Sequence, residues 1–241
     1  MCILALVVPQ PGGVLQVAAN RDEFLKRPAA PPSIWDEGWL APRDLEAGGT
    51  WLGLNPRGLF VGVTNRAGAH RVADRRSRGL LVTDALRAAD VPSLHQELAA
   101  LPADRYNAFH LAYADGTSAG LTWSDGERLH QELLGPGLHL VTERSLGAGD
   151  DRERVGQLRE VLVGRALVDV EGWLGGLSRH AATPLASTCV HADPVGYGTR
   201  SAFVLHRAPT AAASRCAWTE ARPCTSPAHD GTALLRSMAR W

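Results

Sequence analysis

Short apolar runs broken by turn residues shape the start of the chain. Residues 3–8 and 14–19 are apolar, and a Pro-Gly-Gly segment at residues 11–13 separates them. Apolar runs of this length joined by proline and glycine are typical of a β-hairpin. The pattern therefore predicts that the first residues of the chain lie inside a sheet.

Further along, groups of short strands alternate with pairs of helices. Apolar runs ending at turn residues predict strands at residues 50–54, 59–64, 107–114, 118–123, 129–134, 138–142, 188–191, 201–206 and 214–219. The helical spacing of apolar residues predicts two short helices within residues 77–101, with a break near Pro92. The same spacing predicts helices at residues 152–163 and 168–177.

The turns between strands indicate the fold class. Short hairpin turns imply antiparallel pairing and not parallel strands linked by crossover helices. The proline-rich residues 27–42 are expected to be a loop, and residues 208–227 a loop with a hairpin edge. The order of strands, helices, strands, helices and strands predicts an α+β sandwich. A chain of 241 residues suits one domain spanning residues 1–241.

Composition narrows the classes of partner. Acidic and basic residues number 25 each, so no net charge favours nucleic acid or an anionic membrane. The longest apolar run, residues 3–8, is far shorter than the roughly 20 residues that span a bilayer. Prolines and glycines follow that run too soon for a secretory signal peptide. We therefore expect a cytoplasmic protein whose partner is a small molecule.

A serine nucleophile is not indicated. Residues 116–120 read Gly-Thr-Ser-Ala-Gly and match the G-x-S-x-G elbow of serine hydrolases. That elbow needs a strand, a sharp turn and then a helix. Here Ser118 enters a predicted strand that ends in the Asp125-Gly126 turn, so we interpret the pattern as a glycine-flanked strand.

The cysteines and histidines show no metal-binding spacing. Nine histidines are scattered along the chain, and no C-x-x-C pair or H-E-x-x-H sequence occurs. Cys189 and His191 would face the same side of a strand, and a core thiol beside a half-exposed histidine is favoured over a weak metal site. Free thiols are likewise favoured over a Cys216–Cys224 bridge. No resident metal, nucleotide or other cofactor is expected.

Cys2 differs from the other cysteines because of its position. Removal of Met1 would leave a thiol beside a free α-amine, whose pKa is roughly 7.7–8.0 in a model peptide. Such an amine can accept the proton of its own thiol, so one residue would supply both nucleophile and base. On position alone, a small buried residue is the alternative interpretation.

The polar tetrad at residues 20–23 favours the chemical interpretation. Asn20, Arg21, Asp22 and Glu23 directly follow the second predicted strand, which returns toward residue 2. A solvated turn would also be polar. A neighbouring arginine, however, lowers the pKa of a thiol, and a carboxylate accepts hydrogen bonds from an ammonium group.

Five motifs, in order along the chain, resemble the NRDE family, also called the transport-and-Golgi-organisation family. They are Met1-Cys2, the tetrad at residues 20–23, Gly-Gly-Thr-Trp-Leu-Gly at 48–53, Val-Thr-Asn-Arg at 63–66 and Tyr-Gly-Thr-Arg-Ser at 197–201. That family in turn resembles the N-terminal nucleophile hydrolases. The resemblance implies a four-layer αββα sandwich of antiparallel sheets.

The same resemblance implies roles for individual residues. Cys2 would be the nucleophile, with Arg21 and Asp22 beside it, and Asn65 would donate a hydrogen bond to an oxyanion. Arg200 matches a late arginine lining the same pocket. The resemblance also implies that Asn20 and Arg200 help to bind the substrate.

Glu143 is a departure from the family pattern. The family has Leu-Ser-Asn where this chain has Val-Thr-Glu, ending at Glu143. Glu143 would therefore take the substrate-side position of an oxyanion-binding asparagine. A carboxylate stabilises an oxyanion only when it is protonated, so this site is expected to differ from that of an ordinary amidase.

Two functions follow from the resemblance. One is hydrolysis of a small non-peptide amide or acyl compound through a thioester on Cys2. The other is a non-catalytic protein that uses the same pocket to handle haem, lipid or acyl-CoA, because members of the family are connected with their trafficking. In the second case haem is the candidate ligand.

Overall fold

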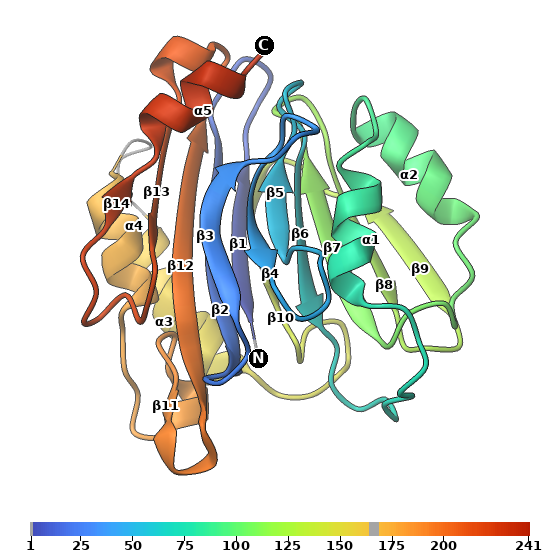
Figure 1. Cartoon of the computed structure of the whole chain (residues 1–241), viewed down its shortest axis with the longest axis vertical. Coiled ribbons are helices and arrows are strands. Elements are labelled where there is room, and N and C mark those ends of the chain that lie inside the picture. Colours follow the sequence, from blue (N-terminus) through green and yellow to red (C-terminus); the bar gives the residue numbers. More distant parts are fainter. Residues whose placement is uncertain (1, 164–168) are drawn as a thin grey trace.

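Two antiparallel sheets lie face to face, with helices on both outer sides (Figure 1). The computed structural model describes residues 2–163 and 169–241. The layers follow the order helices, sheet, sheet, helices. The predicted four-layer αββα sandwich of antiparallel sheets is therefore confirmed.

The first sheet contains the N-terminal hairpin. Its strands, in spatial order, are β10 (Gly137–Thr142), β1 (Ile3–Val8), β2 (Leu15–Phe24), β12 (Tyr197–Arg207), β13 (Arg215–Thr219) and β14 (His229–Asp230), with β11 (His191–Ala192) paired to β12. β1 lies between β2 and β10, so Ile3 pairs with both Asn20 and Thr142. The prediction that the chain starts inside a sheet is confirmed.

The second sheet is formed by the middle of the chain. Its strands follow chain order: β3 (Ala29–Ile34), β4 (Leu40–Asp44), β5 (Leu52–Leu54), β6 (Phe60–Asn65), β7 (Phe109–Ala114), β8 (Ala119–Ser124) and β9 (Leu129–Leu133). The helices are α1 (Arg78–Ala85), α2 (Val91–Ala99), α3 (Arg152–Leu162), α4 (Val170–Leu177) and α5 (Thr232–Met238).

Strand alternation divides the core into three layers. Leu4, Leu6 and Val17 pack between the sheets. Ile3 and Ala18, their neighbours along the strands, pack outward among residues of α3 and α4. A third cluster joins the second sheet to α1 and α2. Because successive side chains of a strand point to opposite faces, residue parity decides which layer each side chain enters.

The prediction of a loop at residues 27–42 is wrong, because β3 and part of β4 lie there. β3 is the edge of its sheet, where a residue without an N–H is tolerated. The register between β3 and β4 also shifts between Ala30 and Ser33, which accommodates Pro31 and Pro32. Proline density therefore marked an edge strand and not a loop.

The predicted pair of short helices with a break near Pro92 is confirmed, and the break lies at residues 86–90. The chain leaves the helix after α1, and Pro92 lies in the first turn of α2. A first-turn proline needs no hydrogen-bond donor, and Asp90 caps the helix by accepting a hydrogen bond from the Ser93 N–H at 2.9 Å. The proline therefore begins a helix here.

Other element boundaries also differ from the predicted ones. β2 runs on to Phe24, so the polar tetrad is strand and not turn. Of the predicted strand at residues 188–191, only His191 lies in a strand. β14 and α5 were not predicted, and Val168, the predicted start of a helix, lies outside the described residues. Within residues 2–163 and 169–241, no helix has the length and apolar character to cross a membrane.

Candidate active site

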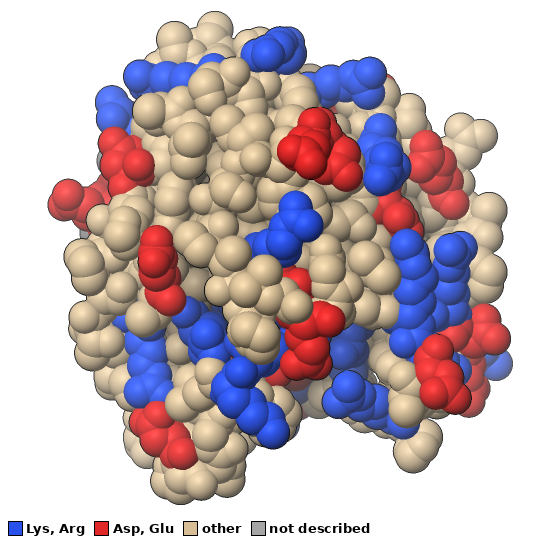
Figure 2. Space-filling model, viewed as in Figure 1, with Lys and Arg blue, Asp and Glu red and all other residues tan. Residues whose placement is uncertain are grey.

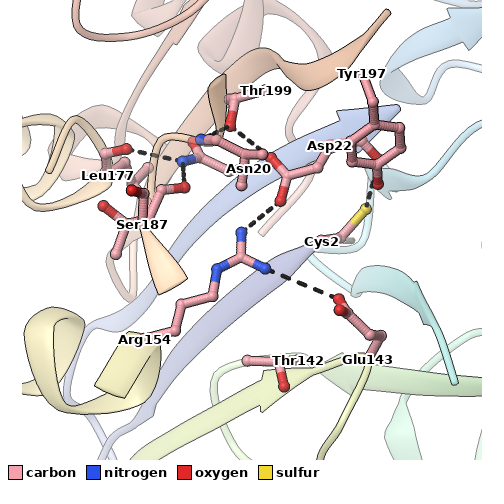
Figure 3. Close-up of polar contacts among 12 residues, drawn as sticks. Cys2, Asn20, Asp22, Thr142, Glu143, Arg154, Leu177, Ser187, Tyr197 and Thr199 are labelled. Carbon is pink, nitrogen blue, oxygen red and sulfur yellow. Dashed lines mark hydrogen bonds and ion pairs between the residues drawn. The ribbon is translucent and has the colours of Figure 1, made fainter. Parts of the chain in front are cut away.

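Cys2 lies at the wall of a polar cavity of about 260 Å³ between the two sheets. The first sheet contributes Cys2 and Arg21, and the second contributes Asn65 at the end of β6. Three of the four residues predicted to be catalytic thus line one cavity. The fourth, Asp22, also lines it, although its carboxylate points away toward Arg154 and Thr199 (Figure 3).

Strand parity explains that difference within the tetrad. Arg21 follows Val17 and Ala19 on the face between the sheets, whereas Asp22 follows Ala18 on the face toward the helices. Cys2 shares the parity of Leu4 and points between the sheets. The tetrad therefore presents Arg21 to the cavity while Asp22 anchors the strand behind it.

The Cys2 thiol is half-buried, and its nearest polar partner is a backbone carbonyl. Its Sγ lies 3.9 Å from the carbonyl oxygen of Asp22, which also accepts a hydrogen bond from the Tyr197 hydroxyl at 2.9 Å (Figure 3). Burial raises the pKa of Cys2, the N-terminal ammonium group lowers it, the Asp22 charge raises it, and the Asp22 carbonyl and Arg21 lower it to a smaller extent. The thiol therefore keeps its proton at neutral pH unless a base accepts it.

Arg21 has unused hydrogen-bonding capacity. Its guanidinium stacks on Trp51, 4.2 Å from the ring centroid, and its side chain is largely buried. Among the described residues its Nη1 has no hydrogen-bond partner. Burial lowers the pKa of Arg21, while the nearby Cys2 and Glu23 raise it. A donor held dry beside the cavity is available to a ligand oxygen.

Asp22 is held by two side chains on the helix-facing side. One carboxylate oxygen accepts from the Thr199 hydroxyl at 2.6 Å, and the other accepts from the Arg154 guanidinium (Figure 3). The Arg154 and Asp22 side chains are both fully buried. Although burial lowers the pKa of Arg154, the attraction of Asp22 raises it above the usual range.

Arg154 was not among the predicted site residues, although the sequence carried a signal. It precedes Leu158 and Leu162 by four and eight positions, so it lies on the apolar face of α3. An arginine on such a face requires a buried acidic partner. Asp22, from the tetrad in β2, is that partner.

Glu143 follows β10 and lies beside the N-terminal strand. Thr142 pairs with Ile3, which places Glu143 next to Cys2 across the strands. Its Oε2 lies 3.8 Å from Nη1 of Arg154, and it does not line the cavity. Burial raises the pKa of Glu143, and Arg154 partly opposes this. The protonated form, which can donate a hydrogen bond, is therefore favoured more than in an exposed glutamate.

The cavity is rich in arginine. Its lining residues include Arg21, Arg27, Arg71, Arg75, Arg76 and Arg78, and the carboxylates Asp22, Glu23, Asp44 and Glu46. Arg27 pairs with Asp44 and Glu46, which leaves several cations without an acidic partner on the wall. Figure 2 shows basic side chains, with acidic ones among them, around a recess in the lower half of this face.

A family model, Transport and Golgi organisation 2, matches residues 1–163, which is more than half of the chain. The chain belongs to the Transport and Golgi organisation 2 family. The matched segment includes Cys2, the tetrad, Asn65, Glu143 and Arg154, so the whole cavity lining lies inside it, while Tyr197 and Thr199, which contact Asp22, lie beyond it.

Curated relatives in the Transport and Golgi organisation 2 family align with less than half of this chain. The Mus musculus Transport and Golgi organization 2 homolog is 38% identical over 113 residues, 44% of this chain and 41% of the mouse protein. The Homo sapiens homolog is 38% identical over 111 residues, 44% of this chain and 40% of the human protein. The chain thus matches about two fifths of the length of these relatives.

Solved structures show the same fold at low identity. The Caenorhabditis elegans N-acylethanolamine-hydrolyzing acid amidase ortholog has a TM-score of 0.54 at 12% identity, covering 84% of this chain and 92% of its own. A mutant conjugated bile acid hydrolase from Clostridium perfringens has a TM-score of 0.57 at 11% identity, covering 95% and 92%. The predicted likeness to N-terminal nucleophile hydrolases is therefore confirmed as a likeness of fold.

All three residues of the predicted substrate-binding set, Asn20, Glu143 and Arg200, lie outside the lining of the Cys2 cavity in this family member. Asn20 donates to the carbonyl oxygens of Leu177 and Thr188, both at 2.8 Å, and so ties β2 to the helix layer. Arg200 donates to the carbonyl oxygen of Leu25 and lines a neighbouring cavity of about 90 Å³. Arg21 and Trp51 line both cavities, so Arg200 lies one side chain away from the Cys2 site.

The remaining motifs lie away from this site. Ser118 sits in a turn that leads into β8, so the interpretation of Gly116–Gly120 as a glycine-flanked strand holds, with no strand-turn-helix at that point. All four cysteines are free thiols. Cys189 is buried beside the half-buried His191, and the fold brings His180 and Cys224 to them, which spacing along the chain could not show.

Proposed function

We propose that this protein is an N-terminal cysteine hydrolase that cleaves a small non-peptide amide or a related acyl compound. The supporting observation is the position of the Cys2 thiol, which lines a polar cavity together with Arg21 and Asn65. The proposal includes removal of Met1, which would free the α-amine of Cys2. Fold likeness alone would not carry an activity, so the argument rests on these side chains.

In the proposed reaction Cys2 supplies both nucleophile and base. Its Sγ attacks the carbonyl carbon of the substrate while its α-amine accepts the thiol proton. The C–N bond then breaks, the same proton passes to the leaving amine, and a thioester to Cys2 remains. Water attacks that thioester, its proton passes through the amine to the thiol, and the carboxylic acid leaves. The raised pKa of the buried thiol is the reason a base is needed.

Hydrogen-bond donors at the cavity would hold the negative charge that develops on the carbonyl oxygen. Asn65 lines the same cavity as Cys2, and its amide is the proposed donor from the second sheet. Arg21 has a free Nη1 among the described residues and would position the substrate. Asp22, fixed by Arg154 and Thr199, would keep its own carbonyl oxygen beside the thiol.

The arginines favour a substrate that carries an acidic group. Arg71 and Arg78 line the cavity, and burial together with the charge of Arg71 lowers the pKa of Arg78. A bound carboxylate or phosphate would relieve the repulsion between these cations. We expect acyl amides bearing such a group to be cleaved with higher kcat/KM than neutral analogues.

The decisive experiment compares Cys2→Ala with Cys216→Ala on an acyl amide panel. Cys216 is a buried thiol outside the cavity, so its loss controls for removal of a cysteine. Cys2→Ala should lose at least about a thousandfold in kcat, while Cys216→Ala should retain activity. Turnover that survives Cys2→Ala would overturn the proposal, as would an intact mass showing that active protein retains Met1.

Handling of haem, lipid or acyl-CoA without turnover is the second candidate. The cavity volume of about 260 Å³ falls below the roughly 300–1,000 Å³ of drug-sized ligand pockets, which favours a smaller molecule than haem. Cys2 is the sole cysteine or histidine among the described lining residues and would be the iron ligand. Saturable haem absorbance that Cys2→Ala removes, without turnover of any amide, would select this function.

A further inference from the structure

Four side chains capable of binding a metal converge at the β11 end of the first sheet, outside the Cys2 cavity. Ligand atoms of His180, Cys189, His191 and Cys224 all lie within 4.8 Å of one another. His180 comes from the segment after α4, Cys189 precedes β11, His191 is the first residue of β11, and Cys224 follows β13. All four lie beyond residues 1–163, the part matched by the family model.

The spacing of three of these ligand atoms, from Cys189, His191 and Cys224, suits one ion between them, with His180 within 4.8 Å of each. Cys189 Sγ lies 3.5 Å from Cys224 Sγ and 3.6 Å from His191 Nε2, and His191 Nε2 lies 3.2 Å from Cys224 Sγ. A tetrahedral zinc ion with Zn–S near 2.3 Å and Zn–N near 2.0 Å separates its ligands by about 3.3–3.8 Å. A disulfide would instead require sulfur atoms about 2.05 Å apart.

Burial is graded across the cluster as expected for an ion bound near the surface. Cys189 is buried, His191 and Cys224 are half-buried, and His180 is exposed. The rings of His180 and His191 lie 4.7 Å apart between centroids. His180 is therefore placed to close the outer side of a site whose inner ligand is Cys189.

We propose that His180, Cys189, His191 and Cys224 bind a structural zinc ion. Two cysteines and two histidines form a neutral tetrahedral zinc site when both thiols lose their protons. The site is independent of the proposed hydrolase function, since none of its four residues lines the Cys2 cavity.

Arg222 is the neighbouring group that must adjust. It donates to Nδ1 of His191 at 3.2 Å and also bonds Asp193. Ligation through Nε2 would leave the His191 ring proton on Nδ1, where a second donor is unfavourable. Arg222 would then bind Asp193 alone, a partner it already has.

The ion would stabilise the segment that packs behind residues 20–23. The segment carrying Cys189 holds Asn20 through the Thr188 carbonyl oxygen at 2.8 Å. Its Val190 N–H donates to the Thr199 hydroxyl at 2.8 Å, and that hydroxyl donates to Asp22. Zinc at the cluster would join this segment to the chain after β13 and stabilise the fold.

The test measures zinc directly on the full chain. Protein produced with added zinc under reducing conditions should contain about one zinc per chain, and Cys216→Ala, which removes a thiol elsewhere, should match it. Cys224→Ala should contain less than a tenth of that amount. Because Cys224 is half-buried, this variant is less prone to unfold than one at Cys189.

Two further measurements keep the test independent of folding. His180→Ala changes an exposed side chain and should weaken zinc affinity at least tenfold with an unchanged circular dichroism spectrum. Cobalt should give sulfur-to-metal charge-transfer absorbance in the wild type that Cys224→Ala removes. Wild-type protein that takes up no zinc, equal zinc in Cys224→Ala, or a Cys189–Cys224 disulfide in place of metal would overturn the proposal.

Discussion

At the scale of single residues, the buried pair of Asp22 and Arg154 sets the shape of the site. Asp22 accepts hydrogen bonds from Arg154 and Thr199 behind β2, and its carbonyl oxygen faces Cys2 in front. The carboxylate therefore acts on the thiol through the strand and not by direct contact. The pair is fully buried, so each charge depends on the other.

Removing one partner should be costly. Arg154→Met would leave the Asp22 carboxylate buried without a cation, which is expected to lower the free energy of unfolding by about 3–5 kcal/mol. Adding Asp22→Asn should restore part of this loss, because position 22 then no longer carries a buried charge. Urea unfolding measures both. Arg152→Met, on the exposed face of the same helix, is the control and should unfold at the same urea concentration as the wild type.

Glu143 gives a prediction about pH. Burial raises the pKa of Glu143, so its protonated fraction persists above the usual range and falls as pH rises through the raised value. If the protonated form of Glu143, next to Cys2 across the strands, is the one that supports catalysis, activity should decline in that same interval. Glu143→Gln keeps a donor at every pH and should remove the decline in kcat/KM.

The exposed Glu153→Gln is the control for Glu143→Gln, and its pH profile should match that of the wild type. Stability changes in the same direction. A raised folded-state pKa gives a contribution to folding that is present below the unfolded pKa and is lost as pH rises through the folded pKa. Glu143→Gln should therefore unfold at higher urea than the wild type at neutral pH. A decline of kcat/KM that persists in Glu143→Gln would assign it to another group.

At the scale of elements, the sequence predicted strands better than their ends. Hairpin turns placed β1, β7 and β8 to within a few residues, because period-two burial and turn residues are local signals. β2 extends through polar residues because β12 pairs with it as far as Phe24. That pairing is a contact across the chain, and no pattern within residues 15–24 reports it.

Gly49, in the motif at residues 48–53, allows the loop before β5 to lie close to α1. A Cβ on Gly49 would lie 2.3 Å from the backbone carbon of Gly79, just inside α1. Gly49→Ala should therefore push α1 away from the Thr50 backbone and lower the free energy of unfolding by about 1–3 kcal/mol. Thermal unfolding checks this, and a higher KM is expected because Thr50 and Gly79 line the cavity.

Gly156→Ala is the matched control for this substitution. Gly156 lies inside α3 with open space around the added methyl group, so alanine should stabilise the helix by about 0.5–1 kcal/mol. Opposite signs for the two substitutions are expected. A neutral or stabilising Gly49→Ala would show that the loop before β5 yields without affecting α1.

At the scale of the whole molecule, the site is assembled by the contact between two sheets. Cys2 and Arg21 could be chosen from the sequence because they lie in short motifs. Arg154 could not be paired with Asp22, since 132 positions separate them and the helix layer must first pack on the sheet. The metal-binding cluster could not be predicted from the sequence for the same reason, because its ligands come from three separate segments of the chain.

Packing of the layers also buries histidines, which makes the whole fold sensitive to acid. Burial lowers the pKa of His110 to about 4, assisted by nearby Arg66, and burial likewise lowers that of His206 to about 4. In the unfolded chain both would titrate at roughly 6.5. Between these values the unfolded state binds more protons than the native state, so stability should fall as pH decreases from about 6.5 to 4.

His206→Leu tests this acid sensitivity. Among the described residues neither ring nitrogen of His206 has a hydrogen-bond partner, and the ring packs edge-on against Trp173. Leucine therefore removes no hydrogen bond. The free energy of unfolding should fall less steeply with decreasing pH than in the wild type, by up to about 1.4 kcal/mol per pH unit, the contribution of one proton. The exposed His70→Gln should leave the pH dependence unchanged, since its removal takes away no buried group. Identical slopes for His206→Leu and the wild type would mean that His206 takes up its proton equally in the folded chain, and acid sensitivity would then have to come from His110.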